Sequence, residues 1–249
     1  MSLHLVDLPI ALRDLHLWAG QRGLSAPFDE GLALHHLLGE SFGPRVLQPF
    51  RLMVAPRARK GTLYGYSRQP ADELRQMACA SMTPGLADVV RLDRLRSLPR
   101  PPDAWHPGQR LGFDLRVRPV VRLASALEGR TETGAPLSLR KGAETDAFLA
   151  AVLRGNATER ETVYLDWLGE RLAPAARLDP DTTCLASFRR SVVQRNGRRI
   201  EGPDATVHGT LTVTDAAAFA DLLAGGIGRH RAYGYGMLLL RPPQRTRPC

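Results

Sequence analysis

Short apolar runs alternate with longer amphipathic stretches over the first eighty residues of the chain. The pattern predicts a strand over Leu3–Leu8, a helix over Asp29–Ser41, strands near Leu47–Ala55 and Thr62–Tyr66, and a helix near Ala71–Ala80. The order is therefore β-α-β-β-α, and the pattern leaves a fourth strand open.

A proline-rich stretch, residues 99–108, then interrupts the periodicity as a linker does. We place a domain boundary there. The prediction is an N-terminal domain of residues 1–104 and a C-terminal domain of residues 105–249.

The second part of the chain repeats the alternation of strands and helices. Its predicted elements are a strand over Arg110–Val121, a helical region over Ala143–Leu172, strands near Cys184–Gln194 and Arg198–Val213, a helix over Thr214–Ala224 and a strand over Met237–Leu240. This is the β-α-β-β-α-β order of a ferredoxin-like unit. The predicted fold class is α+β, with two tandem ferredoxin-like (RRM-like, βαββαβ) domains.

The charge balance points to an anionic partner. The 249 residues hold 34 Lys plus Arg against 25 Asp plus Glu, a net charge of +9, and Lys60 and Lys141 are the only lysines. A guanidinium suits phosphates and stacked bases better than an ammonium does, so a polyanion such as a nucleic acid is the expected partner.

Other classes lack support in the sequence. Neither a membrane-length apolar run nor a signal-peptide pattern is present, so we expect a cytoplasmic protein without a membrane partner. The three cysteines, Cys79, Cys184 and Cys249, have no CxxC spacing, so we expect no metal site, no disulfide framework and no cofactor.

The segment 225–240 combines a glycine-rich loop with basic side chains before an apolar strand. Gly226 and Gly228 would let the backbone approach a phosphate, and Arg229, His230 and Arg231 would meet its charge. The simpler interpretation is a tight turn into a last strand. The basic context favours phosphate binding.

A second basic segment spans residues 188–200. Asn196-Gly197 is a strong two-residue hairpin signal. The hairpin would carry five arginines, with the first two lower down on opposite faces and the others at the tip: Arg189, Arg190, Arg195, Arg198 and Arg199. The major groove of A-form RNA is too deep and narrow to be read, so contact with the phosphates of a stem is expected; the alternative is a hairpin whose arginines face water.

Smaller basic clusters contain Lys60 and the pair Arg140 and Lys141, and each could contact RNA. Tyr64 and Tyr66 share one face of a predicted strand. They could stack on bases or pack in a core, and the sequence does not decide between these roles.

The predicted helix over residues 29–41 carries two adjacent histidines. At 100° per residue, Leu34, Leu37 and their neighbours form the buried stripe. His35 then lies at the edge of this stripe and His36 points more nearly to solvent. Taken by itself, a histidine pair on a helix is more often an ordinary surface or capping feature than a catalytic one.

Several segments of the chain share the pattern of one known family: the final strand, helix and glycine loop, the strand that opens the second domain and the histidine-bearing helix. These segments are Gly209–Asp215, Leu222–Leu223, Gly225–Gly228, Tyr233–Leu240, Leu111–Val121 and Leu32–Leu38. On these segments the chain resembles the CasE (Cse3) type of CRISPR repeat-RNA endonuclease of the RAMP superfamily. The resemblance covers most of the chain, except residues 57–102.

The resemblance implies metal-independent cleavage of precursor CRISPR RNA at the repeat hairpin by attack of a 2′-hydroxyl. It also implies retention of the guide RNA and association with the subunits of a Cascade-like effector complex. The histidine of the family's first helix matches His35, and a shift of one residue would place His36 there. Near neutral pH, an imidazole can take the proton of the attacking hydroxyl or give a proton to the leaving oxygen.

Charge stabilisation of the phosphorane could come from Arg22 or from the basic residues of the glycine loop. Leu32 stands where some relatives have a tyrosine thought to assist the histidine. A non-catalytic RNA-binding subunit of a CRISPR ribonucleoprotein is therefore the alternative. A DNA-binding regulator lacks support, because the sequence has neither a helix-turn-helix nor a zinc pattern.

Overall fold

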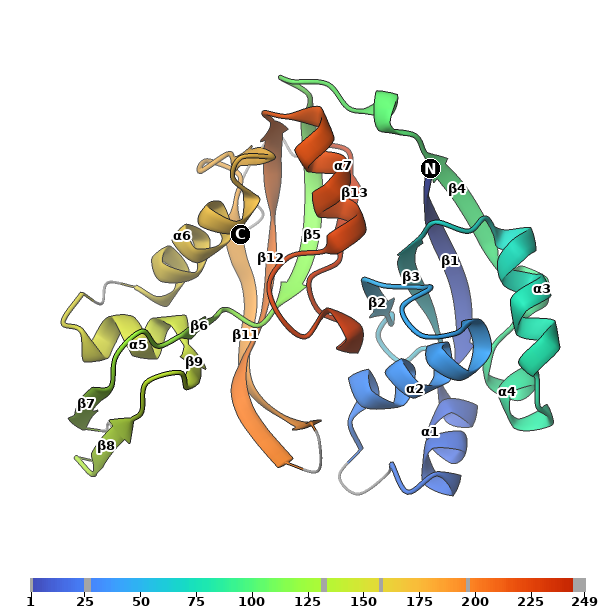
Figure 1. The fold of residues 1–249 in the computed structure, drawn as a ribbon, viewed down its shortest axis with the longest axis horizontal. Helices are drawn as coiled ribbons and strands as arrows, with labels where there is room; N and C mark the ends of the chain where they lie inside the picture. Colours follow the sequence, from blue (N-terminus) through green and yellow to red (C-terminus); the bar gives the residue numbers. More distant parts are fainter. Residues whose placement is uncertain (1, 25–27, 131–133, 157–158, 196–197, 244–249) are drawn as a thin grey trace.

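The computed structural model describes residues 2–24, 28–130, 134–156, 159–195 and 198–243. Two antiparallel sheets stand side by side, each with its own helices, and the helix that follows the longest hairpin lies between them (Figure 1). Within the described residues, no helix has the length and apolar character needed to cross a membrane.

The first sheet has the ferredoxin-like strand order β2-β3-β1-β4, with all its pairs antiparallel. Its strands are β1 (Leu3–Ala11), β2 (Phe50–Met53), β3 (Lys60–Ser67) and β4 (Arg96–Arg100). Its helices are α1 (Leu12–Gln21), α2 (Glu30–Phe42), α3 (Ala71–Ser81), α4 (Pro84–Val89) and the short 3-10 turn η1 (Leu92–Arg94).

This half differs from the sequence expectation in its fourth strand and in two helices, α1 and α4, that the pattern did not predict. The fourth strand exists as β4, and it includes Pro99 from the stretch expected to be linker. Helix α1 was not predicted, because it follows β1 directly at Ala11, without a side-chain cap or a turn residue to mark its start.

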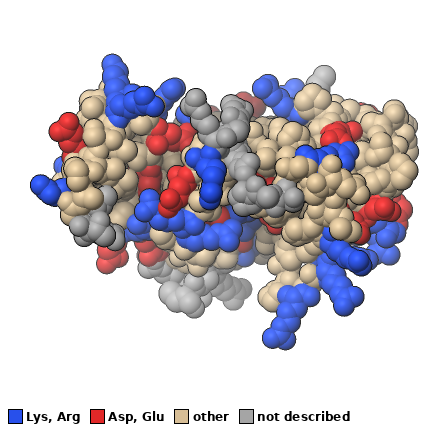
Figure 2. All heavy atoms as spheres, turned by 90° about the horizontal axis from the view of Figure 1, so that it is seen from below, with Lys and Arg blue, Asp and Glu red and all other residues tan. Residues whose placement is uncertain are grey.

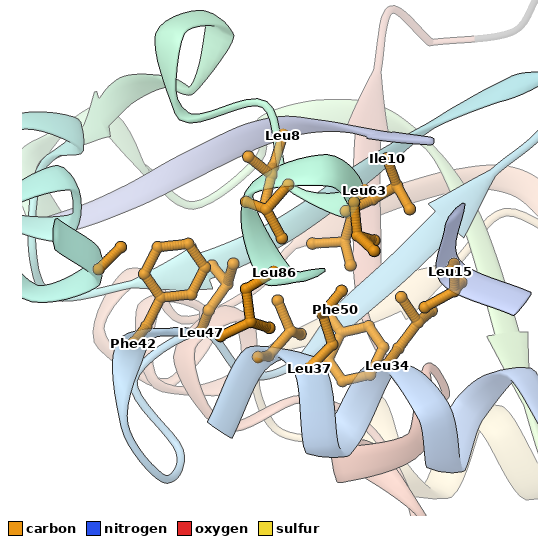
Figure 3. Close-up of a cluster of buried hydrophobic side chains, with 14 of the residues drawn as sticks. Leu8, Ile10, Leu15, Leu34, Leu37, Phe42, Leu47, Phe50, Leu63 and Leu86 are labelled. Atoms are coloured by element: carbon orange, nitrogen blue, oxygen red, sulfur yellow. The ribbon is translucent and has the colours of Figure 1, made fainter. Parts of the chain in front are cut away.

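Side-chain alternation along β1 explains how this half packs. Val6, Leu8 and Ile10 are fully buried against the helices, and Figure 3 shows Leu8 and Ile10 above the buried stripe of α2, where Leu34 and Leu37 point toward Phe50 and Leu63. Because successive strand residues face opposite sides, Leu3 and Leu5 face the second half and pack against its core.

The second sheet has the order β10-β12-β5-β13, with β11 also paired to β12, and this is again the ferredoxin-like arrangement. Its strands are β5 (Arg110–Val117), β10 (Ala176–Leu178), β11 (Cys184–Arg195), β12 (Arg198–Val213) and β13 (Leu238–Arg241). The accompanying helices are α5 (Ala147–Leu153), α6 (Arg160–Leu172), α7 (Ala216–Gly225) and the 3-10 turns η2 (Pro102–Ala104) and η3 (Arg231–Tyr233).

The expected strand 110–121 and helical region 143–172 are each divided. Pro119, which has no N–H to donate, lies between β5 and β6 (Val120–Arg122). The helical region starts as strand β9 (Glu144–Asp146), which pairs with β6, and continues as α5 and α6. A small hairpin of β7 (Leu127–Arg130) and β8 (Pro136–Leu139) was not predicted.

The two halves share a core and polar contacts. Tyr66 is 1% exposed and its hydroxyl donates to the Leu238 carbonyl oxygen at 3.0 Å, so this tyrosine packs in the core and does not stack on bases. The buried pair Arg51 and Asp114 also joins β2 to β5. The α+β fold class with two ferredoxin-like units is confirmed, and the boundary at residues 104 and 105 stays a prediction.

Candidate active site

Helix α2 presents its two histidines differently. The Asp29 side chain accepts a hydrogen bond from the Leu32 backbone N–H at 3.0 Å, which fixes the first turn of the helix. Leu34 and Leu37 are buried, His35 is half-buried and His36 is exposed. His35 is therefore held by its surroundings and remains reachable from solvent, as the helical geometry predicts.

His35 meets the C-terminal loop of the chain. Its ring lies 4.9 Å from the ring of Tyr233, centroid to centroid, with an interplanar angle of 52°. The contact requires a glycine in the first turn of α2, because a Cβ atom at Gly31 would overlap the Tyr233 carbonyl oxygen. The site thus combines residues almost two hundred positions apart.

A small hollow opens beside the two histidines. We call it the α2 hollow; it has a volume of about 280 Å³, and its lining includes His35, His36, Glu40, Arg45 and Ala232. Arg45 is exposed and adopts a left-handed backbone conformation, with φ of 64°. This residue brings a positive charge close to the histidines.

Arg22 lies next to this hollow but is paired. Its guanidinium makes two hydrogen bonds to the Glu40 carboxylate, at 3.1 and 2.7 Å, and stacks over the Trp18 ring at 4.1 Å. The pair would have to open for Arg22 to stabilise charge on a phosphate at His35.

The long hairpin of β11 and β12 is present in the backbone as expected, paired as far as Arg195 and Arg198. Its turn, residues 196–197, and the side chains of Arg195 and Arg198 lie outside the described residues. Arg199 is exposed. Figure 2 shows the molecule from below, and Lys and Arg side chains gather in the middle of this face with carboxylates beside them.

Near the base of the hairpin, one buried carboxylate aligns two arginines. Asp204 of β12 is 4% exposed; both of its oxygens accept hydrogen bonds from Arg116 at 2.8 Å, and one also accepts from Nε of Arg189 at 2.9 Å. The Arg189 side chain stays 70% exposed. Arg190, on the other face, pairs with Glu201 at 3.1 Å.

The protonation states of this cluster follow from its contacts. Burial would lower the pKa of Arg116, but Asp204, Tyr235 and Glu30 together raise it above its usual value. Burial would raise the pKa of Asp204, yet its hydrogen bonds with Arg116 and Arg189 hold it below the usual range. Burial raises the pKa of Glu30 against the opposing effect of the two arginines. Arg116 and Asp204 thus form a fixed ion pair from which Arg189 extends.

A second hollow lies between this cluster and the first turn of α2. We call it the hairpin-root hollow; it has a volume of about 330 Å³, and its lining includes Phe28, Glu30, Arg116, Arg189, Tyr233 and Tyr235. Tyr233 lines this hollow, and its ring contacts His35, which lines the α2 hollow. The contact between His35 and Tyr233 therefore joins residues of the two hollows.

The glycine loop uses much of its charge internally. Glu144 of β9 forms an ion pair with Nε of Arg229 at 2.6 Å and a hydrogen bond with Nε2 of His230 at 2.9 Å. The hydrogen bond with His230 lowers the pKa of Glu144 below its usual value, although burial opposes this. Arg231 donates to the Gly225 carbonyl oxygen.

The loop glycines have steric reasons to be glycine. Both Gly226 and Gly228 have φ of 73°, and a Cβ atom would crowd Pro49 at the first position and the Trp167 ring at the second. These contacts account for the two residues as packing positions, and a phosphate at their N–H groups stays a prediction.

The remaining predicted RNA contacts are dispersed. Lys60 is exposed at the start of β3, paired with Ala11 beside α1. Arg140 and Lys141 are exposed just after β8, at the opposite end of the molecule from α2 (Figure 1). The structure does not bring these two residues to His35.

Sequence reasoning missed Arg45, Arg116 and Asp204. A basic residue in the apolar strand 113–117 was the available signal for Arg116, since a charge on a buried strand needs a partner. The pairing of β5 with β12 brings Asp204 next to Arg116. This pairing joins segments far apart in the sequence, so no local sequence pattern indicates it. Among the described residues, no group of three or more His, Cys, Asp or Glu side chains could hold a metal ion.

Comparison of the chain with known proteins assigns it to a family. The family model described as CRISPR associated protein matches residues 8–242. The chain belongs to this family. A search of curated proteins finds no match.

Solved structures of CRISPR-associated proteins show the same fold. A Cse3 from Thermus thermophilus, bound to an RNA representing a pre-cleavage complex, is 20% identical with a TM-score of 0.61, over 97% of this chain and 100% of that one. Cas6e from Escherichia coli str. K-12 is 20% identical with a TM-score of 0.60, over 96% and 99%. A chain of a CRISPR RNA-guided surveillance complex is 19% identical with a TM-score of 0.54, over 96% and 99%. The predicted resemblance to the CasE (Cse3) type is confirmed at the level of family and fold.

Proposed function

We propose that the chain is a metal-independent endoribonuclease that binds a CRISPR repeat hairpin and cleaves precursor CRISPR RNA. The observation that carries the proposal is the position of His35, half-buried on α2 and in ring contact with Tyr233. His35 lines one hollow and Tyr233 lines the other, and each hollow contains an exposed arginine. Two similar solved structures, a Cse3 bound to an RNA and a chain of a CRISPR RNA-guided surveillance complex, support an RNA substrate and a place in an effector complex.

The reaction needs only proton transfers and charge stabilisation. The ribose 2′-oxygen attacks the adjacent phosphorus and loses its proton to a base, while the bond from phosphorus to the 5′-oxygen breaks and that oxygen takes a proton from an acid. The products are a 2′,3′-cyclic phosphate and a 5′-hydroxyl. An imidazole can perform either transfer, and we assign one of them to His35, with His36 as the alternative.

The RNA stem would lie along the long hairpin. Arg189 is the best-oriented contact, because Asp204 fixes its Nε and leaves the end of the side chain exposed. Arg190, Arg195, Arg198 and Arg199 would add phosphate contacts along the same strands. We also propose that the protein keeps the cleaved guide RNA, joins effector-complex subunits and acts in the cytoplasm.

The rival function is a non-catalytic RNA-binding subunit. One observation favours it: Arg22, Arg229 and His230, expected to stabilise charge, already have carboxylate partners. Arg45 is the exposed arginine that lines the same hollow as His35.

Cleavage of the repeat hairpin from the chain's own CRISPR locus tests the proposal. The reaction is run in EDTA with native protein, His35→Ala and His36→Ala, and RNA binding is measured in parallel. We expect cutting at one position, lost in His35→Ala with binding kept, and blocked for all proteins by a 2′-deoxy nucleotide at the cut. Tight binding without cutting by native protein would establish the non-catalytic subunit instead.

A further inference from the structure

We propose that the hairpin-root hollow is a binding site for one unpaired nucleotide of the RNA, with preference for a base that carries an exocyclic amino group. The inference rests on the proposed function and assigns a substrate position to it. The hollow lies between α2 and the base of the long hairpin, so both halves of the protein line it.

Size and lining suit a nucleotide. The volume of about 330 Å³ is at the lower end of the range for small-ligand sites, roughly 300–1,000 Å³. Tyr233 is half-buried at its edge, and Phe28 is stacked on His16 with ring centroids 4.1 Å apart. Aromatic faces of this kind are the usual platforms for unpaired bases.

The charged groups of the hollow are already arranged. Both oxygens of Asp204 accept hydrogen bonds from Arg116 or Arg189, and these bonds hold the two guanidinium groups in place before a phosphate arrives. Glu30 approaches Arg116 only to 3.8 Å, and its side chain is 42% exposed. This carboxylate is thus placed to accept a hydrogen bond from an amino group on adenine, cytosine or guanine, which uracil lacks.

The location of the hollow relates the nucleotide to the cut. Tyr233 both lines the hollow and touches the His35 ring. A base held against Tyr233 therefore places its own backbone next to His35. The bound nucleotide is one of the two that flank the scissile phosphate.

The test replaces each flanking base in turn with an abasic residue and with 2-aminopurine. With native protein, we expect one flanking position at which the abasic RNA is cut at least 10-fold more slowly, and at which 2-aminopurine fluorescence is quenched on binding of a 2′-deoxy, uncut RNA. Tyr233→Ala should relieve the quenching. Effects below 2-fold at both positions, with no quenching, would overturn the site.

Glu30→Ala tests the base preference. Exchange of the base at the sensitive position for uracil should slow native protein at least 5-fold and slow Glu30→Ala by less than 2-fold. Glu73→Ala is the matched control, since Glu73 also lies in the first turn of a helix, α3, and is exposed there. An equal response to uracil in native protein and both variants would remove Glu30 from base selection.

The outcomes separate this inference from the nuclease assignment. If RNA with an abasic residue at either flanking position is cut at the normal rate, the nucleotide site is excluded and the nuclease assignment stands. Quenching at one flanking position without any cutting would keep the site and overturn the nuclease. The abasic measurements need only native protein, so they decide the question even if a variant does not fold.

Discussion

Gly31 of α2 and Tyr233 of the C-terminal loop approach so closely that no Cβ atom fits between them. The contact lies one turn of helix before His35, and it brings the Tyr233 ring to 4.9 Å from the imidazole. The position of the proposed catalytic group therefore depends on a backbone contact between the two halves of the chain.

Gly31→Ala should impair cleavage through this contact. A glycine-to-alanine change within a helix ordinarily stabilises it by about 0.5–1 kcal/mol. At Gly31 the new methyl group must displace Tyr233, so we expect a loss of at least 10-fold in the single-turnover rate without a gain in thermal stability. Gly169→Ala in α6 is the control, because a Cβ there has open space. It should raise stability and leave the rate unchanged; equal rates for the two variants would contradict the argument.

Tyr233 should act on the rate through its ring. An aromatic pair contributes about 0.5–1.5 kcal/mol beyond area burial, which corresponds to roughly a 2- to 12-fold preference for the held orientation of His35. We expect Tyr233→Ala to lower the single-turnover rate by about that factor and to change the pH dependence of the rate, whereas Tyr233→Phe stays within about 2-fold of native. Identical pH profiles for all three proteins would show that the ring does not position His35.

The sequence predicted the parts of this site that depend on local pattern. The helical period of α2 placed Leu34 and Leu37 in the core and His35 at the edge, and Asn196-Gly197 predicted the hairpin whose strands the structure contains. Both signals span only a few residues, so they can be read without the fold.

The parts it missed depend on contacts between distant segments. The partners of Asp204, Arg116 and Arg189, come from two neighbouring strands, and Tyr233 reaches α2 only through the packing of the two halves. Sequence spacing carries no information about such pairs. The same holds for Glu144, which pairs with Arg229 and His230, two of the loop residues expected to meet RNA.

The buried pair Arg51 and Asp114 should contribute strongly to stability. Asp114 is 6% exposed and faces Arg51, His208 and Arg241, and burial lowers the pKa of Arg51 to about 10. Removing one partner of a buried pair leaves the other charge uncompensated and costs about 3–5 kcal/mol. We expect Asp114→Asn to lower the free energy of unfolding in urea by that amount.

Glu201→Gln provides the comparison for this measurement. It breaks the ion pair between Glu201 and Arg190, whose side chains are 57% and 62% exposed, respectively. Such exposed pairs contribute about 0–1 kcal/mol to stability. Similar losses in the two variants would mean that the contact between β2 and β5 does not hold the halves together.

Glu144 should make the stability of the glycine loop depend on pH. Its pKa in the folded protein is lowered, chiefly by the hydrogen bond with His230, so the unfolded chain takes up the proton first as pH falls. The stabilisation is present above the ordinary glutamate value of about 4.5 and is lost as pH falls below it.

At pH 7 we expect Glu144→Gln to lower the free energy of unfolding by about 1.5–3 kcal/mol, the range for hydrogen bonds to charged groups. Urea unfolding between pH 7 and pH 3 should show this difference shrinking below pH 4.5, while Glu128→Gln, at an exposed position of β7, follows native protein throughout. A gap between native protein and Glu144→Gln that stays constant to pH 3 would mean that Glu144 does not hold the loop as a carboxylate.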